Sequence, residues 1–98
     1  MTIQKTMNGN TLEIALEGRL DTVTAPELEA ELKDSTEKAD ALVFDLTKLD
    51  YISSAGLRVL LSAHKAMSRK GGMKVTPVNE IVQEVFDVTG FSDILTIE

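Results

Sequence analysis

The stretch "LVFDLTKLDYISSAGLRVLL", Leu42 to Leu61, decides the fold because it joins a buried strand to a helix. The segment "ALVFDL" (41–46) is almost continuously apolar, with β-branched and aromatic residues, which is typical of a strand buried on both faces of a parallel sheet. From Leu57 onward, apolar residues recur at helical spacing. The segment between them, "TKLDYISSAG" (47–56), is predicted to be a loop that ends in small residues at the start of a helix.

Before this stretch the sequence predicts a β-hairpin and a first helix. "TIQKTM" (2–7) and "TLEIALEG" (11–18) alternate apolar and polar residues, and "NGN" between them is a turn signal. Thr24, Pro26 and Glu27 then match a capping box, in which Thr24 caps a helix with Pro26 in its first turn. The buried face of this helix is predicted to carry three apolar residues: Leu28, Leu32 and Ala39.

Beyond the central stretch the sequence predicts two more strands and a third helix. "KGG" (70–72) closes the second helix, and "MKVTPV" (73–78) follows as a short strand. Asn79 is suited to cap a third helix, which Gly90 ends. The segment "ILTI" (94–97) is then predicted to form an edge strand.

The order β-β-α-β-α-β-α-β predicts one α/β domain over residues 1–98. We expect a mixed β-sheet with an antiparallel opening hairpin, right-handed crossovers between parallel strands, and helices packed on the sheet. The chain is 43% hydrophobic and 27% charged, which fits a soluble globular domain rather than a disordered tail.

Composition excludes several classes of function. Cysteine is absent and there is one histidine, so thiolate and histidine-cluster metal sites are excluded, and we expect no metal or cofactor. The net charge of −6 argues against nucleic acid, because phosphate binding needs a basic surface. The N-terminal segment has no apolar signal region, and no apolar run approaches the roughly 20 residues of a membrane span. We therefore expect no membrane insertion and a cytoplasmic location.

Two loops are predicted to meet at one edge of the sheet. "GRLDTVT" (18–24) leaves the second strand and "TKLDYISSAG" (47–56) leaves the third, and the carboxyl ends of parallel strands lie on the same side. Asp21 and Thr22 should therefore lie near Ser53 and Ser54, although they are far apart in sequence.

Nucleophilic catalysis by these serines is excluded by distance. A serine nucleophile needs a base within hydrogen-bond reach, and the only histidine, His64, is ten residues beyond Ser54. If the segment is helical, its rise separates the two by roughly 15 Å. His64 also falls on the apolar stripe of its helix, where a packed histidine is common. No glycine-rich phosphate loop is present, so a small enzyme or nucleotide-binding domain has the least support.

Two interpretations of the serines remain. Either hydroxyl can cap the helix, and Gly56 would permit close packing of that helix on a strand. Alternatively, one serine accepts a phosphate, since Ala55 and Gly56 leave the hydroxyl approachable by another protein's active site. A phosphate would meet the free N–H groups of the helix start and would add a charge of about −1.5 to −2.

The sequence resembles the STAS domain of bacterial anti-sigma factor antagonists. The resemblance rests on "GRLDTVTAPEL", "LVFDLTKLDYISSAGLRVLL" and "GGMKVTPVNEIVQEVFDVTGF", and it covers nearly the whole chain. It implies a partner-switching regulator and not an enzyme. The unphosphorylated antagonist binds an anti-sigma factor, often itself a serine kinase, and frees a sigma factor for transcription. The kinase then phosphorylates the antagonist and breaks the complex, and a metal-dependent serine phosphatase restores it.

The resemblance also implies a phosphorylated residue. Family members usually read Asp-Ser-[Ser/Thr]-Gly-Leu, with the first serine phosphorylated. Alignment on Gly56 and Leu57 places that serine at Ser54, with Ser53 as the alternative acceptor. Here Ser53 stands in place of the usual Asp, and Ala55 in place of the following Ser or Thr.

The expected partner surface surrounds this serine. Asp21 matches a family position near the same surface, and the full expected set is Asp21, Thr22, Ser53, Ala55, Gly56 and Arg58. On the second helix Arg58, Ser62, Lys65 and Arg69 recur at helical spacing, either as a solvated face or as a basic stripe for an acidic partner. The alternative function is a STAS scaffold or transporter-associated subunit, in which the serines only cap the helix.

Overall fold

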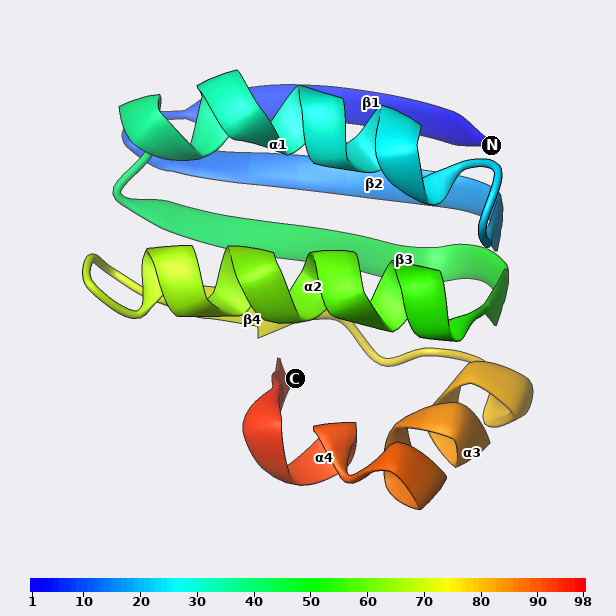
Figure 1. Cartoon of the computed structure of the whole chain (residues 1–98). Helices are drawn as coiled ribbons and strands as arrows, with labels where there is room; N and C mark the ends of the chain where they lie inside the picture. The colour runs from blue at the N-terminus through cyan, green and yellow to red at the C-terminus, as the bar shows by residue number, and fades with distance from the viewer.

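The computed structural model describes all 98 residues and confirms the predicted α/β fold, a five-stranded mixed sheet with helices packed on it (Figure 1). The elements in chain order are β1 (Thr2–Asn8), β2 (Thr11–Leu20), α1 (Ala25–Lys38), β3 (Ala41–Ile52), α2 (Ser54–Met67), β4 (Met73–Val75), α3 (Glu80–Thr89), α4 (Phe91–Ile94) and β5 (Thr96–Ile97).

The strands lie in the sheet in the order in which they occur in the chain. β1 pairs antiparallel with β2, and every later neighbour pairs in parallel, as the sequence predicts. Because each crossover steps in the same direction, right-handed connections place the helices on the same face of the sheet. Figure 1 shows α1 lying over β1 and β2, and α2 lying over β3 and β4.

The core fills the space between this face and the helices, in one cluster of 23 buried apolar residues. Along β3 the side chains of Leu42, Phe44 and Leu46 point into it, whereas Val43 and Asp45 are half-buried on the other face. The prediction that this strand is buried on both faces is therefore wrong. The sequential strand order leaves no helix to cover the second face.

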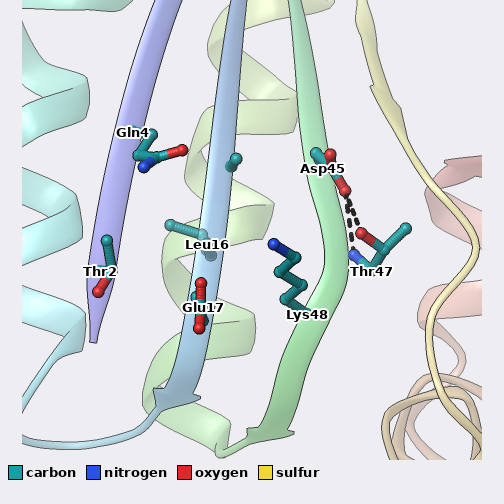
Figure 2. A pocket seen from close by; sticks show the side chains of 8 residues that line it. Thr2, Gln4, Leu16, Glu17, Asp45, Thr47 and Lys48 are labelled. Carbon is teal, nitrogen blue, oxygen red and sulfur yellow. Dashed lines mark hydrogen bonds between the residues drawn. The ribbon is translucent and has the colours of Figure 1, made fainter.

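Figure 2 shows this second face, with the helices behind the strands. Gln4 on β1, Glu17 on β2 and Lys48 on β3 border a hollow of about 160 Å³. The side chain of Asp45 accepts hydrogen bonds there from the amide of Thr47 at 3.1 Å and from its hydroxyl at 2.7 Å. The exposed face of the sheet is thus mostly polar.

β3 continues further than the sequence predicts, to Ile52 rather than Leu46. The segment from Thr47 to Ile52 stays extended because its backbone pairs with β2, for example Leu49 with Gly18 and Ile52 with Leu20. The register shifts twice, between Ala15 and Glu17 and between Gly18 and Arg19 of β2, and at each shift one additional residue of β3 bulges out. The predicted loop before α2 is reduced to Ser53.

The C-terminal part combines a confirmed helix with an additional one. Asn79 caps α3, since its Oδ1 accepts a hydrogen bond from the amide of Val82 at 2.8 Å, and its Nδ2 donates to the carbonyl of Leu49 at 2.9 Å. Gly90 ends α3 in the left-handed conformation, with φ of 81°. The sequence does not predict α4, which takes Ile94 out of the expected strand "ILTI".

Candidate functional site

Three helices, α1, α2 and α3, begin at the same edge of the sheet, where the parallel strands end (Figure 1). The two predicted loops meet there, because the amide of Ser53 donates a hydrogen bond to the carbonyl of Leu20 at 2.9 Å. A groove of about 400 Å³ separates the first turns of α1 and α2. It is lined by Thr22, Ala25, Pro26, Glu29, Ala55, Arg58, Val59 and Ser62.

Ser53 occupies the cap of α2. Its backbone is extended, and its Oγ accepts a hydrogen bond from the amide of Gly56 at 3.5 Å, a long contact. The side chain is half-buried. This hydroxyl therefore performs the capping role that the sequence left open between the two serines.

Ser54 is the first residue of α2 and is exposed. Its hydroxyl makes no hydrogen bond to any other residue of the chain, in contrast to that of Ser53. A side chain at this position projects from the start of the helix beside Ala55, which lines the groove. Ser54 is thus the freer of the two hydroxyls for chemistry by another protein.

Gly56 brings the start of α2 close to the sheet. A Cβ atom at this position would lie 2.7 Å from Cγ of Leu20 and 2.9 Å from Cγ1 of Ile52, both of which are buried. Only glycine permits this approach without displacement of a core side chain. Gly56 therefore fixes where Ser54 lies relative to the ends of β2 and β3.

Asp21, not Thr24, caps the start of α1. Oδ1 of Asp21 accepts hydrogen bonds from the amides of Val23 at 3.0 Å and Thr24 at 3.2 Å, and its carbonyl accepts one from Ala25 at 2.8 Å. The Thr24 side chain makes no cap bond and donates instead to the carbonyl of Arg19 at 2.8 Å. The predicted capping box at Thr24 is therefore wrong. Thr24 already has helical backbone angles, its hydroxyl bonds the Arg19 carbonyl, and the Glu27 amide donates to the Thr24 carbonyl instead of its side chain.

The hydrogen bond from the Thr24 amide is the main reason why the pKa of Asp21 lies below its ordinary value of 3.8. A lowered folded-state pKa means that the ionised carboxylate stabilises the fold above the unfolded-state pKa, and that this stability is lost as the pH falls through the folded-state pKa. We expect wild type to exceed Asp21→Asn in thermal midpoint at pH 6, with the difference shrinking below pH 3.8. Asp34→Asn, which removes an exposed carboxylate of α1, is the control. A difference that is constant from pH 6 to pH 2.5 would contradict this role.

Sequence reasoning missed a contact beside this cap. The guanidinium of Arg19 lies 4.4 Å from the centre of the Tyr51 ring, and its Nε is 3.8 Å from Oδ2 of Asp21. The two side chains meet because Arg19 and Tyr51 are register partners on β2 and β3. Tyr51 is an aromatic residue of the kind favoured in strands, and this could have indicated the contact. Because residues 47–56 were predicted to be a loop, the pairing of Tyr51 with Arg19 was not foreseen.

Arg58 lies one helical turn beyond Ser54, is exposed and lines the groove. It takes part in none of the chain's ion pairs, whose cations are Lys5, Arg19 and Lys74. Ser62 and Lys65 continue the exposed stripe along α2, as the spacing predicts. Arg69 does not, because α2 ends at Met67 and Arg69 lies in the following turn.

His64 lies on the far part of α2 from the serines. It is half-buried, and its Nδ1 is buried without a hydrogen-bond partner. Continuous helix from Ser54 to Met67 separates it from Ser54, so the two side chains do not meet.

The sequence matches the family model of the STAS domain over residues 2–98. The chain belongs to the STAS domain family. Among curated relatives, BtrV of Bordetella bronchiseptica, named as a candidate anti-sigma factor antagonist, is 39% identical over 84% of this chain and 72% of its own length. The anti-sigma-B factor antagonist of Bacillus subtilis is 31% identical over 92% of this chain and 84% of its own length. The resemblance drawn from the sequence is confirmed.

Solved structures share the fold of this STAS domain. An anti-sigma factor antagonist from Mycobacterium paratuberculosis superposes with a TM-score of 0.89 at 23% identity, covering 98% of this chain and 83% of its own. SpoIIAA in its unphosphorylated form gives 0.85 at 18% identity over 99% and 88% of the two chains. The phosphorylated form of the Bacillus SpoIIAA gives 0.77 at 17% identity over 99% and 91%. No helix of this STAS domain has the length and apolar character needed to cross a membrane.

Proposed function

We propose that this STAS domain is an anti-sigma factor antagonist that binds an anti-sigma factor through the edge around Ser54. Phosphorylation of Ser54 by a serine kinase, in the simplest case the anti-sigma factor itself, releases the partner, and a serine phosphatase restores binding. The family match and the relatives named as anti-sigma factor antagonists support the regulatory role. The chain contributes a surface and an acceptor hydroxyl, and the chemistry belongs to its partners.

The contrast between the two serines is the observation that carries the proposal. Ser53 caps α2 and is half-buried, so modification at Ser53 would remove a cap. The Ser54 hydroxyl is exposed and forms no hydrogen bond within the chain, so phosphorylation there breaks no contact of the fold. A phosphate at the first position of α2 is also compatible with the helix dipole.

A phosphate at Ser54 would change the edge where we place the partner. It adds a charge of about −1.5 to −2 beside a groove that Thr22, Ala55 and Arg58 line. An acidic group of the partner that faces Arg58 would then be repelled, and the bulk of the phosphate would occupy the groove mouth. Asp21, Ser53 and Gly56 complete the proposed surface by fixing the two helix starts.

The test compares partner capture by wild type, Ser54→Ala and Ser54→Asp from host extracts, with mass spectrometry to identify the anti-sigma factor. We expect Ser54→Ala to bind like wild type and Ser54→Asp to bind at least about tenfold more weakly, since a charge opposed at an interface costs over 1.4 kcal/mol. Ser68→Asp, which makes the same charge change at the other end of α2, should bind like wild type. Equal capture by Ser54→Asp would contradict the switch and favour a constitutive STAS scaffold.

A further inference from the structure

We propose that Arg58 binds the phosphate of phosphorylated Ser54 within the same chain. Phosphorylation would then withdraw a cation from the partner surface in addition to introducing an anion. The inference takes the modification of Ser54 from the proposed function. Binding of that phosphate by Arg58 follows from the geometry of α2 and from the contacts of the neighbouring charges.

The spacing of the two residues places them side by side. α2 is continuous from Ser54 to Met67, and residues four apart on a helix have Cβ atoms about 5–6 Å from each other. An anion that precedes a cation by four residues is the favourable orientation of such a pair. The planar guanidinium of arginine also matches phosphate with two parallel N–H···O bonds, which a lysine does not provide.

No carboxylate competes for Arg58 in the structure. It is exposed and takes part in no ion pair, although Glu29 of α1 lines the opposite wall of the same groove. Asp21 is engaged by the amides of Val23 and Thr24 and faces Arg19. Glu27 and Glu80, in the first turns of α1 and α3 at the same edge, form no ion pair with Arg58. The first turn of α2 contains no acidic residue at all. A phosphate on Ser54 would therefore be the nearest anion along the helix.

Pairing of Arg58 with the phosphate would weaken the binding of an acidic partner. The chain has ten Lys and Arg against sixteen Asp and Glu, so it offers few positive charges to an acidic partner. Arg58, which forms no ion pair and lies beside the acceptor serine, is one of them. Once Arg58 turns to the phosphate, an acidic group on the anti-sigma factor loses its counter-charge. The modification would then act twice at one place, by repulsion and by removal of an attraction.

The experiment uses the full chain carrying phosphoserine incorporated at position 54 during translation, so that no kinase or partner is needed. The second pKa of the phosphate, ordinarily about 6, is measured by ³¹P NMR titration. A nearby arginine favours the dianion and lowers this pKa, so we expect wild type to titrate about 0.15 to 0.4 pH unit below Arg58→Gln, the size of an i,i+4 pair. The shift should shrink in 1 M NaCl, which screens exposed charges.

Two variants make the test specific. Lys65→Gln removes the same charge from the same exposed stripe three turns away, and it should leave the phosphate pKa at the wild-type value. Arg58→Lys should restore part of the shift, because the charge is kept and the paired N–H donors are lost. Equal phosphate pKa values for wild type and Arg58→Gln, or equal shifts for Arg58→Gln and Lys65→Gln, would overturn the inference even if Ser54→Asp releases a partner. Conversely, absence of any partner switch would not alter the titration.

Discussion

Replacement of Phe44 by alanine is expected to lower the free energy of unfolding by about 3 to 5 kcal/mol, the usual cost of truncating a buried phenylalanine. Phe44 is fully buried in the centre of β3, where it packs in the core beneath the helices. Val43→Ala, one residue earlier in the same strand, should cost about 1 kcal/mol or less, because that side chain lies half-buried on the exposed face. Urea unfolding followed by circular dichroism measures both values.

The pair of variants tests whether helices cover only one face of the sheet, and it does not test β-propensity. Both changes replace a residue favoured in strands by alanine, so a purely local effect would be similar in the two. If Phe44→Ala does not fold, Phe44→Leu at the same position supplies a milder truncation, still expected to cost more than Val43→Ala. Equal large losses at both positions would mean that a layer covers the second face and would contradict the fold described.

The sequence predicts the element order correctly apart from the short helix α4, because periodicity and most helix boundaries are local signals. Asn79 and Gly90 bound α3 as expected, and the turn after β1 forms where "NGN" predicts it. The burial of β3 could not be predicted in the same way. Ala41 and Val43 are apolar whether or not a helix covers them, and the answer depends on the order of strands in space, which local pattern does not contain.

The end of β3 was missed for a related reason. The residues from Thr47 to Asp50 are mainly polar, and they remain in the strand through backbone pairing with β2 despite two bulges. Pairing and register are properties of two segments together. A prediction from the apolar pattern of one segment therefore ends the strand at the last apolar residue of the run, Leu46.

For the candidate site, topology sufficed to bring Thr22 near Ala55, because parallel strands end at the same edge. Which hydroxyl caps each helix could not be decided from sequence. A shift of one residue at a helix start exchanges the roles of Ser53 and Ser54. At α1 the carboxylate of Asp21 accepts from amides that precede the helix, and the Thr24 hydroxyl makes no cap bond. These assignments depend on backbone angles that both candidate residues could adopt.

Gly56→Ala is expected to destabilise the protein, because the steric cost of the added methyl group exceeds the gain in helix propensity. Alanine is the better helix former by about 0.8 to 1 kcal/mol, so propensity alone predicts a more stable protein. The added Cβ would lie 2.7 Å from Leu20 and 2.9 Å from Ile52, and both side chains are nearly fully buried and cannot swing into solvent. Overpacking of this kind costs about 1 to 3 kcal/mol, so we expect a net loss of stability in urea unfolding.

A double-mutant cycle separates this steric cause from any other effect at Gly56. Leu20→Ala is destabilising alone, because it empties a fully buried position, but it also removes the atom closest to the new Cβ. The two losses should therefore sum to more than the loss of the double variant, with a coupling of about 1 kcal/mol or more. Additive losses, or a Gly56→Ala protein more stable than wild type, would show that Leu20 at the end of β2 shifts to accommodate the added Cβ atom. The contact would then not fix the position of Ser54, and the first turn of α2 would be free to shift when a partner binds.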